Sequence, residues 1–122
     1  MLDVVTSTIP VRNLAFHDTF GMGVANVFAA LSCGVRTFDS SIAGLGGCPY
    51  SPGATGNVAT EDVVHALQGS GYATAGNLTA LVETGFWISE QLGRVNESRA
   101  GRAYQAAQPQ KEKKEEDKKG VL

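Results

Sequence analysis

Apolar residues recur at helical spacing in three stretches of the chain. In the first, residues 22–32, they fall at positions i, i+3, i+4 and i+7, and Gly34 is expected to end the helix. The second begins at Thr60, an N-cap residue followed by two acidic residues that favour the positive end of the helix dipole. The third begins near Asn77. The residues predicted to form the buried faces are Val24, Val27, Phe28, Leu31, Val63, Val64, Leu67, Leu78, Leu81, Val82, Ile88 and Leu92.

Short apolar runs outside these helices favour β-strands. Residues 13–17 are predicted to form one buried strand, and residues 35–42 the next. Strands that alternate with helices are typical of an α/β protein with parallel strands, in which ligands bind beyond the carboxyl ends of the strands. The polar pair at positions 17 and 18 ends the first strand, and the pair at 40 and 41 ends the second. We therefore expect these polar side chains at one mouth of the fold.

The distribution of charge separates the last part of the chain from the rest. Every lysine lies at or after Lys111, whereas residues 1–110 carry five arginines and eight acidic residues. A mildly acidic body offers no basic face to a phosphate backbone, so the composition disfavours nucleic-acid binding. No run of about 18 apolar residues predicts a membrane span, and no targeting segment is apparent. We expect one globular domain over residues 1–103 and a disordered, charged tail over residues 104–122.

A glycine-rich loop with a single cysteine follows the second predicted strand. It spans residues 44–57, and its glycines alternate with bulky or rigid residues such as Leu45, Pro49 and Tyr50, unlike those of a flexible linker. We expect this loop to be held in one shape, with Cys48 facing a ligand. On these residues alone, a structural thiol is the alternative to a catalytic one, since buried cysteines are common in proteins.

The hydroxymethylglutaryl-CoA lyase family has a signature loop that closely resembles the run Ser40-Ser41-Ile42-Ala43-Gly44-Leu45-Gly46-Gly47-Cys48-Pro49-Tyr50. The resemblance extends over residues 2–94 and implies a (β/α)8 TIM barrel, a fold that needs about 250 residues. A chain of 122 residues is too short to close that barrel, so the expected fold is its C-terminal portion, of the α/β class. The implied activity is the cleavage of hydroxymethylglutaryl-CoA into acetoacetate and acetyl-CoA, a step of leucine catabolism and ketone-body formation.

The resemblance also implies roles for individual residues. Cys48 matches the cysteine that transfers a proton at carbon. His17 and Asn57 match two protein ligands of a divalent cation, Mg²⁺ or Mn²⁺. Asp18 and Glu61 are expected to support such ligands through hydrogen bonds without touching the cation themselves.

The metal site implied by the family is incomplete in this sequence. Where the family has a His-X-His pair, the chain has only the second histidine, as if two residues before Phe16 were deleted. An aspartate ligand and an arginine that polarises the thioester-side carbonyl belong to an earlier part of the family barrel. We therefore expect this polypeptide to be inactive alone. The alternative is a non-catalytic remnant, or the product of an incomplete gene model, that acts at most as an interaction module.

For a full-length relative, the resemblance implies an acyl-CoA substrate and a homodimer. It also implies the mitochondrial matrix as the compartment, with the peroxisome and the cytosol as alternatives. Neither nucleic acid nor a membrane is an expected partner.

Three other features have simpler interpretations. Residues 21–26 read Gly-Met-Gly-Val-Ala-Asn, and Asp39 ends the next predicted strand, which imitates a dinucleotide-binding fingerprint. An asparagine stands where that fingerprint has its third glycine, so we expect no nicotinamide site. His65 is expected to be a partly exposed helix residue without a ligand role, and Cys33 is expected to pack as a small apolar residue.

Overall fold

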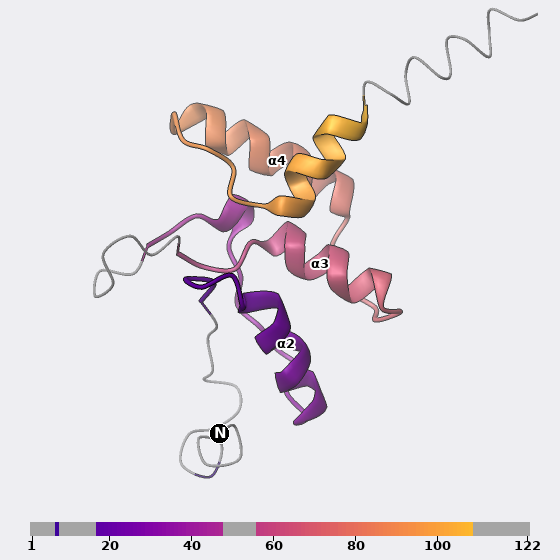
Figure 1. Cartoon of the computed structure of the whole chain (residues 1–122). Helices are drawn as coiled ribbons and strands as arrows, with labels where there is room; N and C mark the ends of the chain where they lie inside the picture. Colours follow the sequence, from indigo (N-terminus) through magenta and orange to yellow (C-terminus); the bar gives the residue numbers. More distant parts are fainter. Residues whose placement is uncertain (1–6, 8–16, 48–55, 109–122) are drawn as a thin grey trace, which may run out of the picture.

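The computed structural model describes residue 7, residues 17–47 and residues 56–108. Its regular elements are α2 (Gly23–Ser32), the short 3₁₀ turn η2 (Ile42–Gly44), α3 (Thr60–Gly69) and α4 (Leu78–Gln91), followed by helical residues 99–108. In Figure 1, α3 lies between α2 and α4, and α4 and α3 both contact η2. None of the helices in the described part of the chain is long and apolar enough to cross a membrane.

The three helices predicted from apolar spacing are confirmed. α2 begins at Gly23, and beyond its last residue Gly34 takes a φ of 91° and donates its N–H to the carbonyl of Leu31 over 3.0 Å. Asn77 is the N-cap of α4, where its side chain accepts a hydrogen bond from the backbone N–H of Ala80 at 3.0 Å. Local sequence chemistry is sufficient to place these helix ends.

Two details of the helices differ from the prediction. Thr60 is not an N-cap: Ala59 occupies that position, and the Thr60 hydroxyl lies 2.8 Å from the hydroxyl of Ser40. Leu92, predicted on the buried face of α4, is 55% exposed because the helix ends at Gln91 and the chain turns away at Gly93.

The predicted strands are reduced to two isolated bridges within the described residues. Residues 35–40 run without a ladder, and Ser41 forms a single parallel bridge with Ala59. His17 forms an antiparallel bridge with Asn57 and is exposed, while residues 13–16 of its predicted strand lie outside the described residues. A strand needs a neighbour to pair with along its length, and here the backbone of Ser41, at the end of the segment, bonds Val58 and Thr60.

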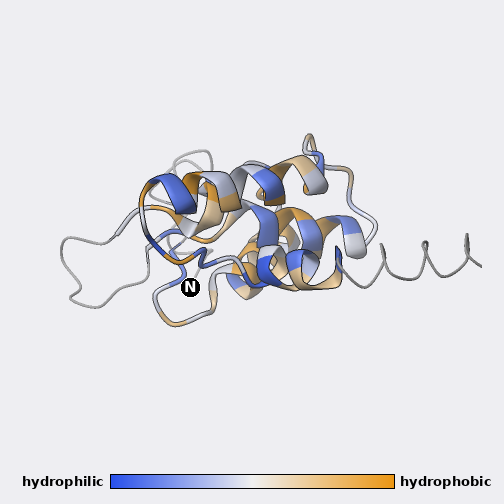
Figure 2. Ribbon diagram, turned by 90° about the horizontal axis from the view of Figure 1, so that it is seen from above, coloured by the Kyte–Doolittle hydropathy of each residue, from blue (hydrophilic) through white to orange (hydrophobic). Residues whose placement is uncertain are grey.

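The main hydrophobic cluster lies between α2, α3 and the extended residues before α3. Its buried members are Val27, Val58 and Val63. The partly buried side chains around them are Val24, Leu31, Phe38 and Leu67. Figure 2 shows hydrophobic and hydrophilic positions alternating around the helices, as this one-sided packing requires.

Two sequence-based expectations about exposure need correction. Cys33 does not pack in the core: it is an exposed free thiol at the C-cap of α2, one position beyond the helical residues whose buried face includes Ala30. Residues 104–108, assigned to a disordered tail, are exposed but helical, so the last helix crosses the expected boundary at residue 104. Residues 109–122 lie outside the described part of the chain.

Candidate functional site

The structure brings the two predicted metal ligands together through their backbones. His17 and Asn57 form the antiparallel bridge, and next to it the N–H of Asp18 donates to the carbonyl of Gly56 over 3.1 Å. The two residues are forty positions apart in the sequence, so this pairing depends on the chain folding back after η2. The two residues therefore lie side by side on adjacent segments.

The side chain of Asn57 is oriented by a hydrogen bond to the glycine-rich segment. Its amide nitrogen Nδ2 donates to the carbonyl oxygen of Leu45 at 3.1 Å. With the nitrogen so directed, the amide oxygen is the atom suited to a hard cation such as Mg²⁺. A Cβ atom on Gly46 would lie only 2.6 Å from the Asn57 nitrogen, so the glycine is what permits this approach.

Asp18 has a structural task at the start of α2. Its carboxylate oxygen Oδ1 accepts the backbone N–H of Gly23 at 2.6 Å. A Cβ atom on Gly23 would lie 2.8 Å from this oxygen and 3.0 Å from the side chain of Val58. The glycine of the apparent dinucleotide motif is therefore explained by the close approach of Asp18 and Val58 to the helix start.

Glu61 is fully buried at the first turn of α3, and its carboxylate faces η2. Both carboxylate oxygens accept the N–H of Ala43, each at 3.0 Å. Burial raises the pKa of Glu61, the negative charge of Asp62 raises it further, and hydrogen bonds from its own N–H and that of Ala43 oppose the rise. Its carboxylate oxygens thus bond the backbone ahead of the glycine-rich loop.

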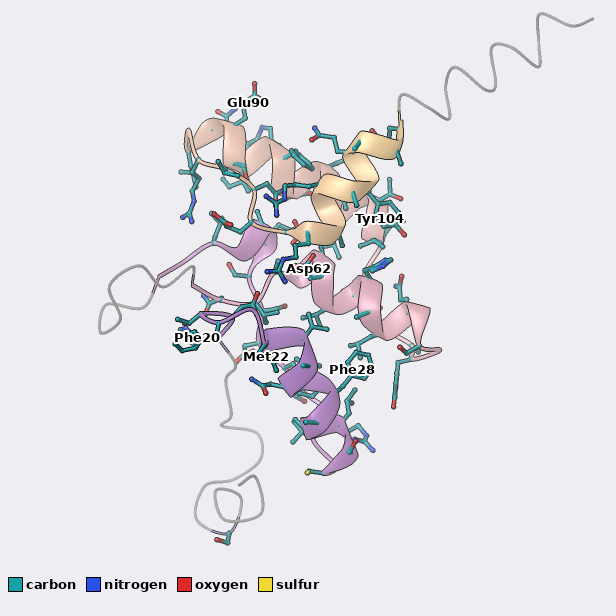
Figure 3. The ribbon with its side chains drawn as sticks, viewed as in Figure 1. Phe20, Met22, Phe28, Asp62, Glu90 and Tyr104 are labelled. Atoms are coloured by element: carbon teal, nitrogen blue, oxygen red, sulfur yellow. The ribbon has the colours of Figure 1, made fainter. Side chains whose placement is uncertain are left out.

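A polar cavity of about 390 Å³ connects these residues with the C-terminal part of the chain. Its lining residues are Asp18, Thr19, Phe20, Gly21, Gly44, Asn57, Ala59, Asp62, Glu97, Arg99 and Arg102. Figure 3 shows Asp62 between the start of α3 and the helical residues 99–108, with Phe20 beside the start of α2. Sequence reasoning missed Glu97, Arg99 and Arg102, because no local motif marks them and only the fold returns them to this cavity.

The donor set for a cation is partial within the described residues. His17 and Asn57 supply an imidazole and an amide oxygen, both acceptable to Mg²⁺ or Mn²⁺. Among residues 17–47 and 56–108, no group of three or more His, Cys, Asp or Glu side chains is arranged to hold a metal ion. Cys48, the predicted catalytic residue, lies outside the described residues. The described residues thus include two of the predicted donors, fewer than an octahedral cation requires from a protein and its substrate together.

Comparisons with known proteins give a matching family profile and several relatives of high identity. A family profile described as HMGL-like matches residues 1–88. The hydroxymethylglutaryl-CoA lyase of Pseudomonas mevalonii is 58% identical over 108 residues, which are 87% of this chain and 36% of that protein. The human mitochondrial hydroxymethylglutaryl-CoA lyase is 48% identical over 84% of this chain and 32% of its own length. The chain therefore spans about a third of the length of these relatives.

Solved structures show the same partial coverage. The crystal structure of hydroxymethylglutaryl-CoA lyase from Pseudomonas aeruginosa superimposes with a TM-score of 0.77 and 50% identity, over 86% of this chain and 36% of that one. An HMG-CoA lyase from Acenitobacter baumannii, in complex with coenzyme A and 3-methylmalate, gives a TM-score of 0.73 and 39% identity over 84% of this chain and 34% of its own.

Proposed function

The chain belongs to the HMGL-like family, and from this premise we propose that it provides the C-terminal part of a hydroxymethylglutaryl-CoA lyase. The proposed reaction breaks a carbon–carbon bond of hydroxymethylglutaryl-CoA and yields acetoacetate and acetyl-CoA. The observation that carries the proposal is the backbone bridge between His17 and Asn57, which pairs two residues of the types a lyase of this kind needs as cation ligands.

Family membership confirms the resemblance of the glycine-rich loop and the fold class predicted with it. The chain is a portion of a TIM-barrel-type protein, mostly helical over its described residues, and it corresponds to about 36% of a full-length relative. Within the described residues, the parallel bridge between Ser41 and Ala59 has the strand direction of such a barrel, whereas the bridge between His17 and Asn57 is antiparallel.

The reaction divides into three tasks. The tertiary hydroxyl of the substrate loses its proton, the carbon–carbon bond breaks to release acetoacetate, and the acetyl-CoA enolate gains a proton at carbon. A bound divalent cation supplies charge stabilisation at the hydroxyl and carbonyl oxygens. His17 and Asn57 are the residues proposed to hold this cation, and Cys48 is proposed to move the proton to carbon, a task that suits a thiol with a lowered pKa.

The finer attributes of the whole protein follow from the family as proposals. We propose Mg²⁺ or Mn²⁺ as the cation, an acyl-CoA substrate, a homodimeric full-length protein, and a role in leucine catabolism and ketone-body formation. The mitochondrial matrix is the proposed compartment, supported by the human relative named as mitochondrial, while the Pseudomonas relatives are bacterial. The peroxisome and cytosol stay as alternatives, and so does a non-catalytic remnant acting as an interaction module.

A chimera tests whether this segment is competent. Residues 17–122 are joined behind the complementary N-terminal portion of the Pseudomonas mevalonii relative, so that the junction falls just before His17. The chimera is expected to release acetoacetate from hydroxymethylglutaryl-CoA in the presence of Mg²⁺, and a Cys48→Ala version is expected to lose that activity. A chimera that is folded by circular dichroism, yet cleaves no substrate, would favour the non-catalytic remnant.

A further inference from the structure

The turn that precedes the glycine-rich loop contains an unusual backbone conformation. Ala43, at the centre of η2, has a φ of 54°, and among the described residues other than glycine it alone has a positive φ. A left-handed conformation places the Cβ atom of an L-residue too close to its own carbonyl oxygen. Ala43 is also 1% exposed, so its peptide groups cannot rely on water. Contacts from elsewhere in the chain must therefore hold this turn.

Two segments bind the turn from opposite sides. The N–H of Ala43 donates to both carboxylate oxygens of Glu61, and the carbonyl of Ala43 accepts the N–H of Glu97 at 3.1 Å. A Cβ atom on Gly44 would lie 3.1 Å from the Cβ of Glu97, so the two backbones are in close contact. The turn is thus held between the first turn of α3 and the residues that precede the last helix.

The residues around Glu97 are in turn fastened to α3 by Asp62. One carboxylate oxygen of Asp62 accepts the Ser98 hydroxyl at 2.8 Å and the N–H of Ala100 at 2.7 Å, and the other accepts the N–H of Arg99 at 3.3 Å. Asp62 therefore caps the N-terminus of the helix over residues 99–108, although it is thirty-six positions before Ser98. The Ser98 hydroxyl completes the cap by accepting the N–H of Gly101 at 2.8 Å.

We propose that Glu61 and Asp62 act together as positioning residues, and that the C-terminal segment 96–101 is a clasp that keeps the Ala43 turn in its left-handed conformation. Asp62 fixes the clasp by accepting its hydrogen bonds, and Glu97 of the clasp donates its N–H to the carbonyl of Ala43. Glu61 accepts the N–H of Ala43. The same turn carries Gly44 and leads to Leu45, whose carbonyl orients the amide of Asn57. Release of the last helix would therefore loosen the wall of the polar cavity next to Asn57.

The proposal concerns the conformation of the chain and holds whether or not the polypeptide turns over substrate. Hydrogen–deuterium exchange by mass spectrometry on the 122-residue chain tests it, with Asp62→Ala as the variant and Glu90→Ala as a matched control, because Glu90 is an exposed acidic residue of α4. In Asp62→Ala, amides of residues 42–46 and 96–101 are expected to exchange at least tenfold faster, while α2 keeps its rate. Asp62→Asn, which keeps one acceptor oxygen, is expected to restore much of the protection.

Three other exchange patterns would either contradict the proposal or require a second variant. If residues 96–101 exchange faster while residues 42–46 do not change, the clasp does not hold the turn and the proposal is wrong. If Asp62→Ala also accelerates exchange in α2, the Ser98→Ala variant is measured, because it removes a single side chain of the cap. In Ser98→Ala, residues 42–46 and 96–101 must both exchange faster while α2 keeps its rate, or the proposal is wrong. Uniformly fast exchange in the unmodified chain would also overturn the proposal, since no clasp would then be formed.

Discussion

The adjacent acidic residues Glu61 and Asp62 differ in burial and in hydrogen-bond partners once the chain has folded. In the sequence both are first-turn acids of a helix. In the structure Glu61 is fully buried against Ala43, whereas Asp62 is half-buried and caps a different helix. The two side chains leave α3 at successive positions, about 100° apart around the helix axis, so they meet different neighbours. The raised pKa of Glu61 is a direct consequence of its burial.

At this residue we predict a specific pH dependence of stability. Because the folded-state pKa of Glu61 lies above its usual value of 4.5, the folded chain binds more protons than the unfolded chain between those two values. The free energy of unfolding should therefore decrease as pH rises through this window, and this decrease should be absent in Glu61→Gln. Urea unfolding followed by circular dichroism between pH 5 and pH 8 measures both. Parallel curves for the two proteins would contradict the prediction.

Cys48 and Asn57 should fail in different ways in a full-length barrel that contains this segment. Cys48→Ala is expected to lower turnover by about 10²-fold or more, the usual scale for a lost acid–base group, with little change in the Mg²⁺ requirement. Asn57→Ala is expected to raise the Mg²⁺ concentration needed for activity, because an amide oxygen is a suitable Mg²⁺ ligand and a thiol is not. Mg²⁺ titrations of the chimera and its two variants compare them, and equal shifts in half-saturation would refute this division of roles.

At the scale of elements, α4 contains a glycine at the point where a side chain of α3 packs against it. Gly85 lies in the interior of α4, and a Cβ atom there would overlap Oε1 of Glu61 and lie 3.1 Å from Nδ2 of Asn96. This Asn96 nitrogen is buried and without a hydrogen-bond partner in the described part of the chain, so the space there is already crowded by polar atoms. A glycine in the middle of a helix is unfavourable by itself, and its presence here is explained by packing.

Gly85→Ala is therefore expected to destabilise the chain despite the better helix propensity of alanine. The displaced Glu61 carboxylate should outweigh the gain of about 1 kcal/mol in propensity, for a net loss of about 1–3 kcal/mol. Gly69→Ala is the matched control, because Gly69 is also helical and nothing lies within 4 Å of its Cβ position. Thermal unfolding of both variants checks the prediction, which fails if Gly85→Ala is as stable as Gly69→Ala.

In the molecule as a whole, several large apolar side chains are exposed to solvent. Phe20 is 92% exposed, Val95 66% and Trp87 58%. In the described residues, the extended segments at 35–41 and 56–59 pair through the single bridge between Ser41 and Ala59, so this pairing lacks the neighbouring strands that stabilise a parallel sheet. Surfaces of this kind favour association with other chains.

We predict that the 122-residue chain is marginally stable alone and that it oligomerises or binds hydrophobic dyes. The reason is that exposed apolar surface can be removed from water only by another molecule. Size-exclusion chromatography with light scattering, dye fluorescence and a thermal scan measure these properties. A sharp, cooperative unfolding transition from a monomer without dye binding would identify the chain as an autonomous domain.

The isolated chain is also predicted to lack measurable lyase activity. The cation ligands proposed among its described residues are two, His17 and Asn57, and two donors would hold Mg²⁺ too weakly to define its geometry. The purified chain, with Mg²⁺ and hydroxymethylglutaryl-CoA, should release no more acetoacetate than its Cys48→Ala variant. Turnover that depends on Cys48 would show that the segment is sufficient for catalysis.

The sequence by itself determined the three main helices and the family. Apolar spacing located α2, α3 and α4 because an amphipathic face depends on residues three and four positions apart, which are local in the chain. The run from Ser40 to Tyr50 identified the lyase family because a glycine-rich loop of this length and composition is specific, and the profile over residues 1–88 confirms it.

Only the tertiary structure decided the partners of the polar side chains. It paired His17 with Asn57, turned Thr60 toward Ser40, and directed Glu61 and Asp62 to segments eighteen and thirty-six positions away. It also brought Arg99 and Arg102 to the cavity beside Asn57 and left Cys33 exposed. These outcomes depend on contacts between residues far apart in the chain, and such contacts form only when burial of the common core brings the segments together. Local patterns of hydrophobicity therefore do not predict these contacts.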